Sequence, residues 1–140
     1  MKVQSKQQVT DDQLSILSNP MEIIEIARRG IPRKKVDVLA KAIGLTDRDM
    51  ARILQISERT LHRYKDDTLL DTNASERLLL LSLLYKKGEE VFDNLEKFKF
   101  YMNTATHVYN YKKPLELLDT NTGFQIIEDA LGRLEYGVYI

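Results

Sequence analysis

The residues of this chain best suited to contact another molecule chemically lie in one short basic segment. The stretch Ser57–Lys65 reads SERTLHRYK and mixes hydroxyl, carboxylate, imidazole and cationic side chains. An arginine can donate two hydrogen bonds to guanine in the DNA major groove, and Ser, Thr or Lys can contact phosphate oxygens. We therefore predict DNA contacts here. The candidate residues are Ser57, Glu58, Arg59, Thr60, His62, Arg63 and Lys65.

Arg59 and Arg63 carry most of the DNA interpretation, because they are the residues expected to contact bases. Two alternatives stand beside it. The two arginines could belong to an ordinary solvated helix face, or they could form salt bridges with Asp47 or Asp49.

Two short helices must position these side chains. In Leu45–Tyr64, Thr46 can cap a first helix that runs to about Leu54, and Ser57 can cap a second that runs to about Tyr64. Ala51 is small enough to let the two helices cross closely, which predicts a helix-turn-helix. The expected buried side consists of Ile53, Leu54, Ile56, Leu61 and Tyr64.

The turn between these helices contains an unusual residue. Gln55 stands where glycine commonly sits in a helix-turn-helix. Either Gln55 adopts a left-handed backbone conformation, which glycine adopts at no steric cost, or the turn is longer than usual.

Apolar residues recur with helical spacing along the rest of the chain, so we predict an all-α fold. Residues 1–19 are polar and predict a flexible arm, residues 20–70 a helix-turn-helix domain, and residues 71–140 a second helical domain built around an apolar central helix. The further helices are expected at 20–30, 32–44, 73–88, 89–103, 114–118 and 124–137.

Composition restricts the class of protein. Apolar residues make up 43% of the 140 residues and charged residues 30%, which is enough apolar material for a packed core. There is no cysteine, the first residues are polar, and no apolar stretch approaches the ~20 residues of a membrane span. We expect a cytoplasmic protein that does not enter the membrane.

The formal net charge is zero, but the two halves differ. Residues 1–70 hold 13 Lys and Arg against 10 Asp and Glu, and residues 71–140 hold 8 against 11. The sign agrees with DNA binding by the first half and protein binding by the second.

An enzyme is not expected. The two histidines, His62 and His107, lie in different halves, and no Gly-rich phosphate loop or helix-spaced set of metal ligands occurs. The acidic pairs at 89–90 and 128–129 are adjacent in sequence, so on a helix they point to different sides. We predict no catalytic residue, no cofactor and no metal site.

Several short motifs resemble the Xre/MbcA/ParS family of antitoxins over about residues 28–140. In the first half they are Ile43–Leu45, Ala51–Leu54 and Ile56–Leu61. In the second half they are Ser75–Leu78, Glu90–Asp93, Lys113–Leu118 with Thr120 and Gly123, and Leu131–Gly137. The sequence departs from the family in two places: Phe100 and Tyr101 stand where a tryptophan is usual, and residues 108–112 replace a Gly-rich turn.

The resemblance implies a bacterial type II antitoxin. Its second half would bind and neutralise a cognate toxin, most often an NAD-consuming toxin of the RES class. Its first half would repress its own operon, as a dimer on an inverted repeat and within a larger toxin-antitoxin complex. The runner-up is a stand-alone transcriptional regulator whose second half mediates oligomerisation or binds a small ligand.

The toxin-binding residues implied by the resemblance lie near the end of the chain. The uncharged tail could dock into the toxin near its NAD pocket, or it could fold back on its own core. Tyr109 and Tyr111 could be interface aromatics or a cover for the core. The candidate toxin-binding residues are Tyr109, Tyr111, Arg133, Tyr136, Val138, Tyr139 and Ile140.

A structural role is predicted for Ser75–Arg77. We interpret the segment as a helix start, with Asn73 as the cap and Arg77 in a charge pair. Alternatively, Arg77 holds the loop before Pro114.

Overall fold

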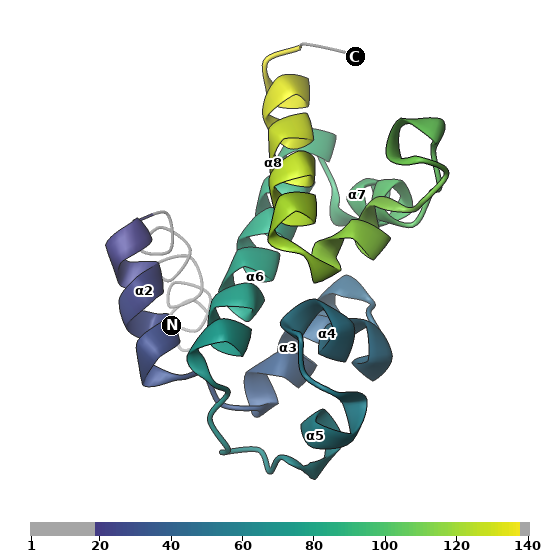
Figure 1. The fold of residues 1–140 in the computed structure, drawn as a ribbon. Helices are drawn as coiled ribbons and strands as arrows, with labels where there is room; N and C mark the ends of the chain where they lie inside the picture. Colours follow the sequence, from purple (N-terminus) through teal and green to yellow (C-terminus); the bar gives the residue numbers. More distant parts are fainter. Residues whose placement is uncertain (1–18, 138–140) are drawn as a thin grey trace, which may run out of the picture.

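The fold is entirely helical within residues 19–137, the part of the chain that the computed structural model describes (Figure 1). In this range the only β-type pairings are two isolated bridges, Pro32 with Leu69 and Thr106 with Lys112. The predicted all-α class is confirmed. The predicted N-terminal arm lies outside the described residues.

The first four helices of the described range begin and end close to the predicted residues. Asn19 caps the first of them and accepts a hydrogen bond from the Met21 amide at 3.0 Å, and Gly30 and Gly44 end the first and the second. The helices are α2 (Pro20–Arg29), α3 (Lys34–Ile43), α4 (Asp47–Leu54) and α5 (Glu58–Arg63).

The second half contains one long helix and several short ones. Helix α6 (Thr72–Phe92) runs through the centre of the molecule, and α2 and α8 lie along it (Figure 1). Its middle is buried on several sides, as the apolar run Leu78–Leu84 predicts. The other elements are α7 (Leu95–Met102), the 3₁₀ segments η1 (His107–Tyr109) and η2 (Pro114–Asp119), and α8 (Asn121–Glu135).

The predicted boundaries around residue 88 are wrong. Helix α6 continues through Gly88 and ends at Phe92, because Gly88 is needed for close packing and not for a turn. A Cβ atom at Gly88 would lie 2.4 Å from the ring of Phe98. The chain turns instead at Asp93, whose φ is +68°, and Asn94 caps α7.

The cap of α6 also differs from the prediction. The side chain of Asp71 accepts a hydrogen bond from the Ala74 amide at 2.8 Å, so Asp71 is the cap in place of Asn73. The Asn73 side chain instead donates to Gln55 Oε1 at 3.1 Å.

One continuous core extends through both halves of the described chain. It joins residues of α3, α4 and α5 to residues of α6, α7, η2 and α8. The polar segment before α6 is also fixed: the Leu70 amide donates to the Ile31 carbonyl at 2.9 Å, and the Ile31 amide donates to Ser75 Oγ at 3.0 Å. The division of the chain at residue 70 stays a prediction.

Arg77 lies where the two halves meet, and only 2% of its surface is exposed. Its Nε donates to the Ile53 carbonyl at the end of α4. Its two terminal nitrogens donate to the Leu118 carbonyl at 2.6 Å and to Asn121 Oδ1 at 2.7 Å. The guanidinium carbon also lies 5.1 Å from the centre of the Phe124 ring.

Arg77 is therefore structural, as predicted, but its partners differ from those proposed. It holds the end of η2 and the start of α8, and not the loop before Pro114. Burial lowers the pKa of Arg77, while the charges of Asp119 and Glu76 raise it. An arginine stays charged under these conditions, so its hydrogen-bond donors are always available.

Replacing Arg77 should destabilise the protein strongly. Arg77→Met keeps an unbranched apolar stem but leaves the Ile53 and Leu118 carbonyls without their donor, so we expect a loss of at least about 3 kcal/mol in the free energy of unfolding. Urea unfolding followed by circular dichroism measures it. The neighbouring exposed variant Glu76→Ala should stay within about 0.5 kcal/mol of the wild type. A loss below about 1 kcal/mol in Arg77→Met would contradict the assigned role.

Candidate functional site

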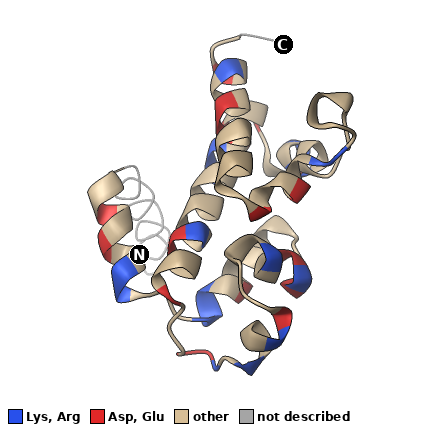
Figure 2. Cartoon of the chain, in the orientation of Figure 1, with Lys and Arg blue, Asp and Glu red and all other residues tan. Residues whose placement is uncertain are grey.

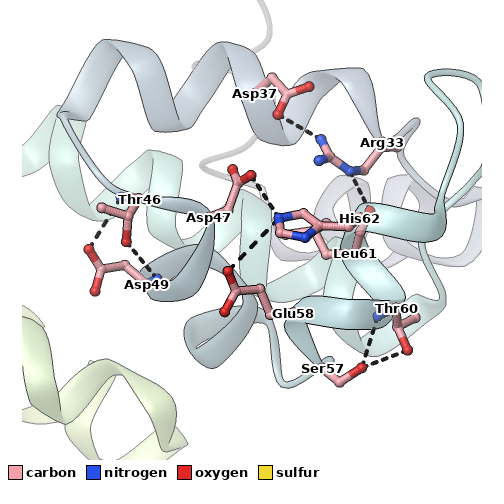
Figure 3. A network of polar contacts seen from close by, with 10 residues as sticks. All are labelled: Arg33, Asp37, Thr46, Asp47, Asp49, Ser57, Glu58, Thr60, Leu61 and His62. Atoms are coloured by element: carbon pink, nitrogen blue, oxygen red, sulfur yellow. Dashed lines mark hydrogen bonds and ion pairs between the residues drawn. The ribbon is translucent and has the colours of Figure 1, made fainter.

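Helix α4 begins with a reciprocal cap (Figure 3). The Asp49 amide donates to Thr46 Oγ1 at 3.1 Å, and the Thr46 amide donates to Asp49 Oδ2 at 3.3 Å. Ala51 is buried, and its carbonyl accepts a hydrogen bond from the Ile56 amide at 3.1 Å across the turn. Helices α4 and α5 pack against each other. The two helices thus form the predicted helix-turn-helix.

The short turn is made by Gln55 in a left-handed conformation, with φ 60° and ψ 40°. The first of the two alternatives for this residue is therefore confirmed. Its side chain adds two contacts that a glycine could not make. Gln55 Nε2 donates to the Asp119 carbonyl at 2.8 Å, and Gln55 Oε1 accepts from Asn73.

Helix α5 is held in place from behind by a buried arginine. Arg33 Nε donates to the Leu61 carbonyl at 2.9 Å, and its terminal nitrogen pairs with Asp37 at 2.7 Å (Figure 3). Leu61 itself is fully buried. The position of α5 is therefore set by α3 and the core, and its outer side remains open to a partner.

Four of the predicted DNA-binding residues are already engaged within the motif. Ser57 caps α5: its Oγ accepts from the Thr60 amide at 2.9 Å and donates to Thr60 Oγ1 at 2.7 Å. His62 Nε2 lies 3.1 Å from Asp47 Oδ2 and 3.9 Å from Glu58 Oε2, which ties α5 to the first turn of α4 (Figure 3). DNA contact by Ser57, Glu58, Thr60 or His62 would have to compete with these interactions.

Arg59, Arg63 and Lys65 are different. All three are exposed, and within residues 19–137 none of them forms an ion pair. The alternative in which Asp47 or Asp49 neutralises Arg59 or Arg63 is wrong, because Asp47 pairs with His62 and Asp49 closes the cap of α4. Figure 2 shows Lys and Arg gathered around α3, α4 and α5, with acidic residues among them.

A second set of predicted residues lies in the connection between α7 and η2. Residues 106–112 form a small hairpin, in which the Thr106 amide donates to the Lys112 carbonyl at 3.3 Å and the Tyr111 amide donates back to the Thr106 carbonyl at 2.8 Å. Tyr109 is half-buried and Tyr111 is 80% exposed. Tyr109 therefore contributes to the core, whereas Tyr111 covers nothing within the described chain.

The end of α8 carries the other described candidates. Lys87 pairs with Glu135 at 2.6 Å and fastens this end of α8 to α6, while Tyr136 is 82% exposed. Arg133 is half-buried, and its Nε has no hydrogen-bond partner among residues 19–137. Val138, Tyr139 and Ile140 lie outside the described residues.

Tyr101 lies between the candidates of the 106–112 hairpin and those at the end of α8. The sequence did not single it out as a site residue. Its hydroxyl lies 2.9 Å from the Tyr109 hydroxyl. Burial raises the pKa of Tyr101 far above its ordinary value, the hydrogen bond with Tyr109 raises it further, and the nearby charge of Arg133 lowers it. The one feature of the sequence that could have pointed to Tyr101 was that Phe100 and Tyr101 stand where family members usually have a tryptophan.

The sequence also did not point to the contacts between the helix-turn-helix and η2. The two terminal nitrogens of Arg52 donate to the carbonyls of Glu116 and Leu115, each at 3.2 Å. A groove of about 760 Å³ lies beside this contact, and residues of α4, η2 and α8 line it with charges of both signs. Nothing in the sequence indicated these contacts, because their acceptors are backbone carbonyls, and every residue type carries the same carbonyl.

The described residues offer no group of three or more His, Cys, Asp or Glu side chains placed to hold a metal ion. None of the helices between residues 19 and 137 is both long and apolar enough to cross a membrane.

Comparison with known families covers most of the chain. The model of the antitoxin Xre-like helix-turn-helix domain matches residues 22–82, and that of the antitoxin Xre/MbcA/ParS C-terminal toxin-binding domain matches residues 87–137. The chain belongs to the Xre/MbcA/ParS antitoxin family. The predicted family is therefore confirmed, and the antitoxin combines a helix-turn-helix with a toxin-binding domain.

The fold of the antitoxin also occurs among solved structures. A chain in the crystal structure of the M. tuberculosis MbcT-MbcA toxin-antitoxin complex superimposes with a TM-score of 0.55 and 18% sequence identity. The match covers 77% of this chain and 96% of that chain. No curated protein matches the sequence.

The strained turn of this antitoxin allows a direct test. Gln55→Ala and Gln55→Gly both remove the hydrogen bonds to Asp119 and Asn73, but only glycine adopts the left-handed conformation freely. We expect Gln55→Gly to be more stable than Gln55→Ala by about 1 kcal/mol in chemical denaturation. Equal stabilities would show that Gln55 is not left-handed in solution.

Proposed function

We propose that this antitoxin neutralises a cognate toxin of the RES class through its C-terminal domain and represses its own operon through α5. The single observation that carries the DNA-binding part is the exposure of Arg59 and Arg63 on α5, and of Lys65 just after it, with no ion pair from any of the three in the described chain. Arg33 fixes α5 from behind. The family match supports a toxin as the partner of residues 87–137.

The RES class of the toxin is the finer part of the proposal and rests on the family resemblance. A RES toxin consumes NAD, so inhibition requires that the antitoxin close or occupy the NAD pocket. The candidates for that contact are the exposed Tyr136 and the uncharged residues that follow it. An aromatic and aliphatic tail is suited to an apolar pocket, because buried aromatic side chains supply much of the binding energy at interfaces.

Repression is expected to require a dimer. A single copy offers few cations on α5, and sequence-independent affinity for DNA grows with the number of phosphates that are neutralised. Two copies that bind half-sites about one helical turn apart would double the contacts and match an inverted repeat. The zero net charge of the chain makes this doubling more important, since long-range attraction to DNA is weak.

The DNA-binding role predicts different effects for arginines that contact bases and lysines that contact phosphate. Arg59→Ala or Arg63→Ala should each cost about 1–3 kcal/mol in binding to the promoter fragment of the operon and relax preference at one position. Lys65→Ala should weaken binding to all sequences equally. Fluorescence anisotropy with the promoter and a scrambled fragment measures both.

Lys97→Ala is the matched control for DNA binding. Lys97 is exposed on α7, outside the helix-turn-helix, and the change removes the same charge. Its affinity for the promoter should equal that of the wild type. If the Arg59 and Arg63 variants also bind as tightly as the wild type, α5 does not contact DNA.

Neutralisation predicts that the end of the chain is required. Growth arrest by the product of the adjacent reading frame should be rescued by the full-length protein and not by a variant that lacks Tyr139 and Ile140. The variant should keep wild-type promoter binding, which shows that it is folded. Full rescue by the variant would exclude the tail from inhibition.

The same growth experiment separates an antitoxin with this partner from a stand-alone regulator. If the neighbouring product is harmless and does not co-purify with the wild type, the proposed toxin partnership fails for that gene pair. Promoter binding by α5 would then remain as an independent result.

A further inference from the structure

The C-terminal domain presents unusually exposed apolar side chains on α7 and on the 106–112 hairpin. Phe100 is 74% exposed, Val108 54% and Tyr111 80%. Single exposed apolar residues are common on protein surfaces, but several within one short segment indicate an interaction site. None of the three contributes to the described core.

Phe100 borders a shallow apolar groove of about 590 Å³. Phe92 and Tyr101 contribute to it, and their ring centres lie 5.2 Å apart. Both rings pack in turn on Phe98, which is fully buried. The groove is therefore built on a packed aromatic cluster and is already formed in the free protein.

The end of α7 is also fixed. Asn103 Nδ2 donates to the Lys99 carbonyl at 2.8 Å, and Thr104 Oγ1 donates to the Phe100 carbonyl at 2.6 Å. The Asn103 amide also donates to both of these carbonyls, at 3.1 and 3.2 Å, so side-chain and backbone bonds together close the last turn. The backbone that carries Phe100 is thereby ordered in the free protein, which lowers the entropic cost of binding.

Tyr111 adds a second and independent observation. Asn110 and Tyr111 have successive φ values of +56° and +64°. A tight hairpin turn favours two left-handed residues of this kind, and asparagine followed by glycine is its preferred sequence. Tyrosine at the second position is strained, and its exposed ring makes no packing that would offset the strain.

The hairpin and α7 are joined directly. The Tyr101 and Tyr109 hydroxyls lie 2.9 Å apart, so one hydrogen bond links the hairpin, just before its turn, to the helix that carries Phe100. The exposed side chains of both elements therefore belong to one preorganised unit.

We propose that Phe100 and Tyr111 are aromatic anchors for the cognate toxin, which accepts them in apolar pockets on its surface. The inference rests on the proposed function and names the surface by which the toxin is held. The toxin is favoured as the occupant because both residues lie within the 87–137 match to a toxin-binding domain. The left-handed backbone at Tyr111 closes the hairpin, but a glycine would do this without strain, and the exposed ring adds no packing to the free chain.

The decisive variant is Tyr111→Gly, because it should change stability and binding in opposite directions. Glycine relieves the left-handed strain, so the midpoint of thermal unfolding should rise. Loss of the ring should weaken binding to the purified product of the adjacent reading frame by at least about ten-fold, measured by isothermal titration calorimetry. Phe100→Ser should lose affinity similarly with little change in the unfolding midpoint.

Val38→Ser is the matched control, since Val38 is 64% exposed but lies on α3. It should bind the toxin as the wild type does. Wild-type affinity in both Tyr111→Gly and Phe100→Ser would overturn the anchor role while leaving the proposed function intact. No binding by the wild type would overturn both the anchor role and the proposed toxin partnership.

A second copy of the chain is the competing occupant of this surface. If the wild type is a dimer in sedimentation experiments, and both variants are monomers with unchanged toxin affinity, the surface joins two antitoxins. That outcome would also overturn the anchor role. Unchanged oligomeric state with weakened toxin binding supports it.

Discussion

The structure depends on one buried cation. Arg77 comes from the central helix and donates to the last turn of α4, to the end of η2 and to the first turn of α8. One side chain thus supplies hydrogen-bond donors to oxygens of three chain segments, two of them backbone carbonyl oxygens and one a side-chain amide oxygen. Only arginine combines five donors in a fixed plane with a permanent charge, so no other residue could replace it here.

The constraint at Arg77 makes the helix-turn-helix and the toxin-binding domain one body. Arg52 and Gln55 strengthen the joint from the helix-turn-helix by donating to carbonyls of η2. Helix α5 lies at one end of this body and the C-terminal end of α8 at the other (Figure 1). A partner at α5 and a partner at the end of α8 would therefore occupy separate surfaces of a shared rigid frame.

Some residues other than glycine adopt a left-handed backbone, against their own conformational preference, where a turn or a contact requires it. Asp93 and Asn110 have short polar side chains that tolerate this conformation, and they occupy simple turns. Gln55 and Tyr111 lack that tolerance. Gln55 offsets its strain with hydrogen bonds to the second half, whereas the Tyr111 ring is exposed, which points to a benefit gained on binding.

The sequence by itself determined the helical class, the helix-turn-helix and most helix ends, because apolar spacing, Thr46, Ser57, Gly30 and Gly44 act locally. It did not determine the course of α6, since Gly88 resembles a helix stop until Phe98 packs against it. It placed Arg59 and Arg63 on an outer face. It could not show that Asp47, a possible salt-bridge partner of these arginines, pairs with His62 instead. The partners of Arg77 and Arg52 are distant in sequence and are mostly backbone carbonyls, and the partner of Tyr101 is a hydroxyl eight residues further along the chain. Only the tertiary structure decided those contacts, because residue type does not encode which of many identical acceptors will lie within reach.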